Sequence, residues 1–177
     1  MFEKLPLAPA ASRPDLLTPS VLAGLALVPQ AMVFEIDPSV SDTAAFCAAY
    51  DLPMDVMANA VLAGGKRAGV TRQACCLTLA HRRVDVNGCV RTRLDVRKAS
   101  FLPMDEAVAA SGMEYGAITP VGLPDGWPVW VDGAVADTPS VIIGAGLRRS
   151  KLVVPGASLL CLPGAQRVDG LARDLAD

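Results

Sequence analysis

The sequence predicts an α+β fold built as a single domain, and three observations lead to this prediction. The chain has 177 residues, a length typical of one domain and sufficient to bury a substantial core. At least six short runs rich in apolar and β-branched residues alternate with short segments that carry helix-capping signals. Tight Gly and Pro turns join many of these segments, whereas a regular βαβ fold needs longer helical connections.

Residues 1–29 are expected to form an N-terminal arm and a short helix ahead of the main domain. Repeated prolines keep residues 1–17 extended. Thr18 can accept a hydrogen bond from the first turn of a helix, and Pro19 suits the first helical position, so a short helix should follow. Residues 32–37 are then rich in β-formers and stop before a proline, which predicts a strand.

The centre of the chain combines capped helices with one antiparallel pair of strands. Asp42 precedes the apolar segment 44–50, which predicts a second capped helix. Residues 59–63 and 74–80 are apolar runs on either side of a Gly-rich, basic turn, and we expect them to pair antiparallel. Asp85 can cap a further helix, whose buried face would carry three apolar residues at four-residue spacing: Val86, Val90 and Leu94.

The second half of the chain predicts short strands separated by turns. Residues 98–102 indicate a strand, and Pro103 can open a helix that ends near Ser111. Residues 112–126 hold four Gly and two Pro, so they are expected to be a loop, and ordered loops of this length often carry function. Further short strands are expected at residues 128–131, 141–143, 151–154 and 166–168, with a short helix starting at Pro155.

The composition excludes several classes of protein. With 52% hydrophobic and 19% charged residues the chain is not intrinsically disordered, and a net charge of −2 disfavours a protein that coats DNA or RNA. Its five Cys form no C-x-x-C pair, which favours buried thiols in a reducing, cytoplasmic compartment. A single His argues against a His-based metal site, so we expect no metal and no organic cofactor. No apolar run near the N-terminus is long enough to enter a membrane.

The best candidate site is a loop. The sequence Gly116-Ala117-Ile118-Thr119-Pro120 combines a flexible glycine with a proline that fixes the turn, and such a segment can direct backbone N–H groups toward a carbonyl or carboxylate oxygen. Gly144-Ala145-Gly146 could bring a second stretch of backbone close to the same ligand. A purely structural turn would have the same sequence, so the residues alone leave both interpretations open.

The order of several short segments resembles the YbaK family, also called the prolyl-tRNA-synthetase-associated editing domain family. The resemblance covers about residues 30–172 and leaves residues 173–177 as a tail. It depends on an ordered set of segments: residues 59–61, the helix after Asp85, Lys98, residues 116–122, residues 129–132 and residues 143–146.

The resemblance implies a mixed, mostly antiparallel sheet of six or more strands wrapped by short helices. It also implies a freestanding aminoacyl-tRNA deacylase, which hydrolyses in trans the ester between a wrong amino acid and the terminal ribose of a tRNA. In that scheme the loop Gly116 to Pro120 holds the aminoacyl group, and Asn59 and residues 144–146 form the pocket wall. The implied partners are mischarged tRNA, contacted transiently at its acceptor end, and a synthetase, but neither DNA nor a membrane.

One position departs from the family pattern. Many members carry a lysine at the start of the strand that holds Asn59, and this chain has Ala58 there. Alanine offers neither charge nor hydrogen-bond donor to a developing oxyanion. Three lysines are candidate replacements (Lys66, Lys98 and Lys151), and Lys98 is the best supported by sequence because it opens a strand beside an arginine-bearing helix. We therefore expect Asn59 and Lys98 to be catalytic.

A second hypothesis follows from Ala58. The chain could be a noncatalytic module that kept the pocket and binds an amino acid, a charged tRNA end or a protein partner. Three basic clusters could meet tRNA phosphates, although solvated surfaces would have the same composition: Lys66/Arg67/Arg72, Arg91/Arg93/Arg97 and Arg148/Arg149/Lys151.

Overall fold

The structure, a computed structural model, describes residues 2–175. The N-terminal segment contains the two-residue strand β1 (Ala8–Pro9), two 3₁₀ turns and helix α1 (Pro19–Gly24). The Oγ1 atom of Thr18 accepts a hydrogen bond from the N–H of Val21, as the capping signal predicts. Leu16 and Val21 are fully buried, so this segment packs against the body and does not extend away from it.

The first sheet has four antiparallel strands in the order β1–β2–β9–β8. Strand β2 (Met32–Glu35) pairs with β9 (Ser150–Val154), and β9 pairs in turn with β8 (Val141–Gly144). All five residues of β9 are buried because the strand lies in the interior of the sheet. One of the five is a lysine, which is unusual for a side chain that is seldom fully buried.

The second sheet has five strands in the order β10–β7–β4–β3–β6. Strands β3 (Ala58–Arg67), β4 (Val70–Leu79) and β6 (Ala99–Phe101) are joined by antiparallel pairing. Strand β7 (Val129–Asp132) is parallel to both β4 and β10 (Ala165–Val168).

A small third sheet pairs β5 (Arg82–Val84) with β11 (Ala172–Asp174). The α+β class is therefore confirmed, but the strands are divided among three sheets instead of lying in one sheet of six or more. Part of the expected tail, 173–177, belongs to β11, and residues 176–177 lie outside the described part of the chain.

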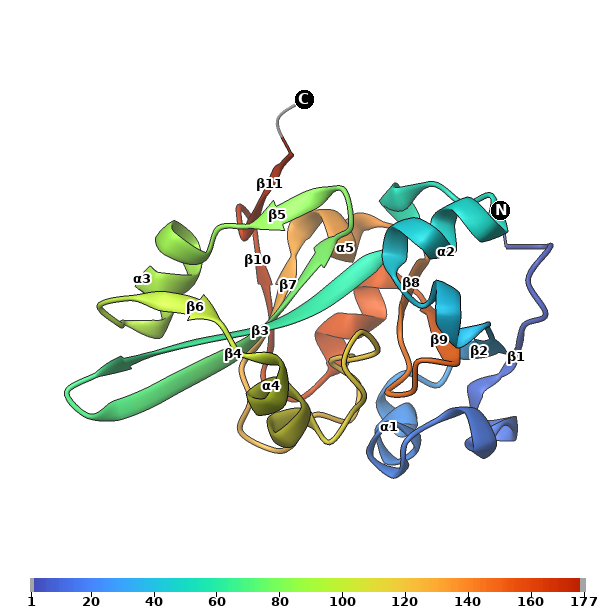
Figure 1. The fold of residues 1–177 in the computed structure, drawn as a ribbon, viewed down its shortest axis with the longest axis horizontal. Coiled ribbons are helices and arrows are strands. Elements are labelled where there is room, and N and C mark those ends of the chain that lie inside the picture. The colour runs from blue at the N-terminus through green and yellow to red at the C-terminus, as the bar shows by residue number, and fades with distance from the viewer. Residues whose placement is uncertain (1, 176–177) are drawn as a thin grey trace.

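Strands β3 and β4 form one long hairpin that projects from the body of the molecule (Figure 1). The sequence predicted a wide Gly-rich turn, but residues 64–67 continue β3, and only Ala68 and Gly69 form the turn. Both have positive φ angles, 49° and 80°, which match the right-handed twist of the flanking strands. Glycines within β3 do not end the strand, because every residue from Ala58 to Arg67 is paired with β4.

The α-helices are short, with four to eight residues each. Helix α2 (Thr43–Tyr50) is capped by the Asp42 carboxylate, which accepts from two backbone N–H groups. Asp85 likewise caps a π-helical turn (Val86–Val90) that continues into α3 (Arg91–Leu94). The remaining helices are α4 (Met104–Ser111), α5 (Gly133–Asp137) and a 3₁₀ segment (Gly156–Cys161).

The two larger sheets meet at a parallel β-bridge between Met57, just before β3, and Ile142 in β8. The N–H of Ala80 also donates to the carbonyl of Met57, at 2.8 Å. Buried apolar side chains fill the space around this junction. Within residues 2–175, no helix is long and apolar enough to cross a membrane.

Candidate functional site

A pocket of about 370 Å³ opens at the junction of the two larger sheets. This volume is at the lower end of the range for small-molecule sites. Its wall combines the start of β3, the end of β8, one residue of β9, the N-terminus of α2, and parts of β6, α4 and the loop after α4. The lining residues are Ser41, Asp42, Thr43, Met57, Ala58, Asn59, Ala60, Val61, Leu62, Phe101, Leu102, Ala107, Tyr115, Gly116, Ile118, Ile143, Gly144 and Lys151.

The loop after α4 presents backbone to this pocket. Gly116 has a φ angle of 84°, a conformation that favours glycine. The N–H of Ala117 donates to the carbonyl of Glu114, and the N–H of Thr119 points to the sulfur of Met113. By contrast, the N–H groups of Tyr115, Gly116 and Ile118 have no hydrogen-bond partner among residues 2–175, and all three residues line the pocket. They are therefore the backbone donors that the loop can offer to a ligand.

The end of β8 packs directly against this loop. A Cβ atom on Gly144 would lie 2.7 Å from the carbonyl oxygen of Ile118 and closer still to that of Ala117. The N–H of Gly146 donates to the carbonyl of Ala117 at 2.9 Å, and the N–H of Glu114 donates to the carbonyl of Gly146 at 2.9 Å. Only a glycine at position 144 allows this close approach, which fixes the loop relative to the sheet.

Arg148 holds the same loop from outside. Its backbone N–H donates to the Glu114 carboxylate at 2.5 Å, and its guanidinium donates to the carbonyls of Tyr115 and Pro38. These bonds join the loop to the turn before α2. The loop is thus anchored at both sides of Gly116, so its backbone donors are preorganised.

Asn59 is oriented by helix α2. The hydroxyl of Thr43 donates to the Asn59 Oδ1 atom at 3.0 Å. This bond leaves the Asn59 amide nitrogen as a donor without a protein partner in the described part of the chain. Because Asn59 lines the pocket, that N–H₂ group is available to a ligand or a water molecule.

Among residues 2–175, Lys151 is the only basic side chain that lines the pocket, and it is only 5% exposed. Its Nζ atom donates to the carbonyl of Ser41 at 3.2 Å and lies 5.1 Å from the centre of the Phe46 ring. Burial lowers the pKa of Lys151 to about 8. Ala58, which also lines the pocket, contributes neither a charge nor a polar side-chain atom.

The structure brings together only some of the residues that the sequence singled out. Asn59, Gly116, Ile118 and Gly144 line the pocket. The other segment residues support them from behind without lining it: Ala117, Thr119, Pro120, Ala145 and Gly146.

Lys98 lies outside the pocket and is exposed. Lys98 precedes β6, and its backbone carbonyl packs so closely against Gly65 that a Cβ atom added there would clash with it. Gly65 lies beyond the part of β3 that lines the pocket. The expectation that Lys98 takes the catalytic place left by Ala58 therefore has no support in its position. The lysine that lines the pocket is Lys151, which the sequence analysis named as one of three candidate replacements but ranked below Lys98.

Neither a metal nor a reactive thiol is indicated. Within residues 2–175, no group of three or more His, Cys, Asp or Glu residues is placed to hold a metal ion. Burial raises the pKa of Cys76 to about 12 and that of Cys75 well above its usual range, so neither thiol is reactive.

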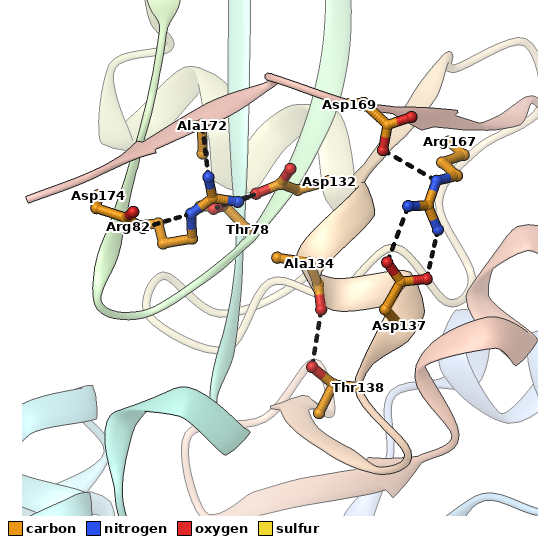
Figure 2. A network of polar contacts seen from close by, with 10 residues as sticks. All are labelled: Thr78, Arg82, Asp132, Ala134, Asp137, Thr138, Arg167, Asp169, Ala172 and Asp174. Carbon is orange, nitrogen blue, oxygen red and sulfur yellow. Dashed lines mark hydrogen bonds and ion pairs between the residues drawn. The ribbon is translucent and has the colours of Figure 1, made fainter.

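A second polar cluster lies away from the pocket (Figure 2). The guanidinium of Arg82 donates to the buried carboxylate of Asp132, to the Asp174 carboxylate at 2.9 Å and to the carbonyl of Ala172 at 2.9 Å. Thr78 donates to the same Asp132 oxygen at 3.5 Å. This cluster joins β4, β5, β7 and β11, and its groups bond one another.

Comparison with solved structures supports the fold. One similar structure is that of a protein proposed to be a trans-editing enzyme for prolyl-tRNA synthetase, with a TM-score of 0.71, 22% identity, and coverage of 86% of this chain and 97% of that one. A scaffold protein used for computational grafting of linear epitopes has a TM-score of 0.72, 22% identity and the same coverage.

A third structure is that of a Marinobacter aquaeolei protein proposed to act in signal transduction. It has a TM-score of 0.59 and 20% identity, and the match covers 89% of this chain but 31% of that one. No curated protein sequence matches the chain significantly.

The family comparison is more specific than these structural similarities. The model of the aminoacyl-tRNA editing domain matches residues 37–162. This range contains the pocket-lining residues, from Ser41 to Lys151. The chain therefore belongs to the aminoacyl-tRNA editing domain family.

Proposed function

We propose that this protein hydrolyses the ester bond between a wrongly attached amino acid and the terminal ribose of a tRNA. The observation that carries the proposal is a small pocket whose wall includes loop residues with unpaired backbone N–H groups, within the region that matches the editing domain. A pocket of this size suits an amino acid linked to one nucleoside better than a larger ligand.

The residues support a mechanism of water attack on the ester carbonyl. The N–H groups of Gly116 and Ile118 would bind the carbonyl oxygen, which becomes an oxyanion in the transition state. Asn59, held by Thr43, would orient the attacking water or a ribose hydroxyl. The neighbouring ribose hydroxyl can assist proton transfer, which lessens the need for a protein base.

Action in trans is the form that we propose. The chain covers 97% of a structurally similar protein described as a trans-editing enzyme for prolyl-tRNA synthetase. In this scheme the partner is a mischarged tRNA that enters with its acceptor end, and a synthetase is a second candidate partner.

One exposed residue in each of two basic clusters is suited to meet tRNA phosphates. Lys66 is exposed near the tip of the β3–β4 hairpin, where it pairs with Thr71, and Arg97 is exposed between α3 and β6, the strand that pairs with β3. The other arginines of the first two clusters are engaged: Arg67 and Arg72 pair with Asp95, and Arg91 and Arg93 donate to Asn87 and Gln166. In the third cluster, Arg148 holds the pocket loop, Arg149 pairs with Glu35, and Lys151 is buried. We therefore expect the tRNA to approach from the hairpin and α3 side.

A noncatalytic binding module is the second candidate, and Ala58 is the observation that favours it. Without a donor at this wall position, the pocket would bind a charged tRNA end and leave its ester intact. The two candidates share the same pocket, so only a measurement of turnover separates them.

The experiment is deacylation of a panel of mischarged tRNAs by the wild-type protein and by Asn59→Ala, with the Lys98→Ala variant beside them. The proposal predicts multiple turnover on at least one charged tRNA and a loss of turnover in Asn59→Ala, with the fold unchanged by circular dichroism. Binding of charged tRNA without turnover would favour the binding module and overturn the deacylase.

A further inference from the structure

The pocket contains a buried ammonium group that the mechanism above does not use. The amine of Lys151 has three hydrogen-bond donors, and the only protein acceptor that it meets among the described residues is the Ser41 carbonyl. It forms no ion pair with any carboxylate in that part of the chain. A buried charge normally requires such a partner, because transfer of an ion out of water is costly.

Contacts with the protein hold the buried side chain of Lys151 at the wall of the pocket. The Ser41 carbonyl, just before the residue that caps α2, accepts one hydrogen bond from the ammonium. The Phe46 ring of α2 faces the same group. The backbone of β9 fixes the start of the side chain between Phe34 of β2 and Gly144 of β8. Gly144 and Lys151 both line the pocket.

The charged and titratable groups around Lys151 leave it close to its titration point at neutral pH. Burial lowers its pKa to about 8, Cys47 and Asp42 act to raise it, and Arg148 acts to lower it. Asp42 and Tyr115 are the other titratable groups on the pocket wall among the described residues. Lys151 is therefore mostly protonated at pH 7 and loses its charge as the pH rises above 8.

We infer that Lys151 is a catalytic residue whose ammonium group contacts the carbonyl oxygen of the ester, opposite the N–H groups of Gly116 and Ile118. This inference rests on the proposed function. In this inference the cation comes from Lys151 on β9, because Ala58 on β3 provides none. The two strands belong to different sheets, and both contribute to the pocket wall.

The step balances without a cofactor or an oxidant. The oxygen of a water molecule bonds to the carbonyl carbon, and the carbonyl electron pair moves to the oxygen that Lys151 and the loop N–H groups stabilise. The pair then returns, the bond from carbon to the ribose oxygen breaks, and one proton of the water ends on that ribose oxygen. The products are a free amino acid and a tRNA with its terminal hydroxyl restored.

The experiment compares Lys151→Met with Lys4→Met, a change at an exposed lysine far from the pocket wall. Deacylation of the best tRNA from the panel is measured at saturating and subsaturating substrate from pH 6 to 9.5, after subtraction of the uncatalysed rate. We expect kcat to fall by about 10²–10³-fold in Lys151→Met, with a much smaller change in KM, and no change in Lys4→Met. Thermal unfolding checks that each variant is folded, and Lys151→Gln replaces the Met variant if it is not.

The pH profile separates a catalytic ammonium from a structural one. Wild-type kcat should fall as the pH rises through about 8, and this fall should be absent from the residual activity of Lys151→Met. Equal kcat values in the two variants, or an unchanged fall near pH 8 in Lys151→Met, would overturn the inference while the deacylase stands. A wild-type protein that hydrolyses no charged tRNA would overturn both.

Discussion

Two charged side chains are buried within residues 2–175, and their surroundings are opposite in kind. Asp132, on β7, meets a guanidinium and a threonine hydroxyl (Figure 2). Lys151, on β9, meets one carbonyl and one aromatic ring, and it borders a pocket. The Asp132 carboxylate has hydrogen-bond partners within the protein, whereas the Lys151 ammonium keeps N–H donors that a ligand could use.

This contrast separates a charge that stabilises the fold from one that serves a ligand. The Arg82–Asp132 pair fastens β5 and β11 to the main sheet, so its loss should appear in stability. The Lys151 ammonium lowers stability in the absence of a ligand, and proteins commonly retain such groups where function needs them. Stability and activity should therefore respond in opposite ways at the two sites.

The Arg82→Met variant should show the largest change in stability. It leaves the Asp132 carboxylate buried without its cation, and loss of one partner of a buried pair typically costs about 3–5 kcal/mol. Burial already raises the pKa of Asp132, so the deficit should shrink as the pH falls and the carboxyl group takes up a proton. Urea unfolding at pH 7 and pH 4.5 measures this, and kcat per folded molecule should stay at the wild-type value.

The Lys151→Met variant should be more stable than the wild type at pH 7. The folded-state pKa of about 8 is below the usual 10.5, so the folded protein disfavours the ammonium form. Removal of this charge should add on the order of 2–3 kcal/mol below pH 8. The wild type regains that difference as the pH rises from 8 toward 10.5. A lower stability of Lys151→Met at pH 7 would contradict this account of the buried charge.

The Gly144→Ala variant tests whether the pocket loop depends on its contact with β8. The added methyl group meets the carbonyls of Ala117 and Ile118, so loop or strand must move. Such overpacking costs about 1–3 kcal/mol. Deacylation should fall as well, because the Gly116 and Ile118 donors shift with the loop. The control for the added methyl group is Gly126→Ala, because no atom lies within 4 Å of the new Cβ there. That residue has a positive φ angle, so the control adds backbone strain but no steric contact.

The Thr43→Val variant should have the smallest effect. It removes the hydroxyl that orients Asn59 while it keeps the size of the side chain. We expect a loss of about 0.5–1.5 kcal/mol in stability and a rise in KM smaller than the loss in Asn59→Ala. Steady-state kinetics of the single and double variants checks the coupling, because the Thr43 effect should vanish once Asn59 is absent.

Local signals predicted the elements well. Thr18, Asp42 and Asp85 each cap the turn or helix that follows them, as their positions indicated. Helix α5 was missed, because its five residues begin with glycine and are too few for a helical period to appear. Strand β11 was missed as well, because it forms only by pairing with β5, almost ninety positions earlier in the chain.

The candidate site was predictable only in part. The glycine loop and Asn59 were identified by their order along the chain, but their partners come from distant segments. Lys151 reaches the pocket because β9 pairs with β8 and because the turn before α2 folds over its ammonium group. An alternating or apolar strand pattern shows that a residue lies in a sheet, but not which neighbouring sheet or helix its side chain meets. For this reason the sequence could not show that Lys98, the favoured lysine, lies outside the pocket.

The unbroken length of β3 sets a fixed distance for any substrate that meets both of its ends. Asn59 at the pocket and Arg67 at the tip are eight residues apart on one strand, or roughly 26 Å at the usual rise. Continuous pairing with β4 holds the two ends of this span at a fixed separation. An aminoacylated nucleoside alone would reach only the pocket end of β3. A tRNA stem several base pairs long would be needed to touch both the pocket and the hairpin tip.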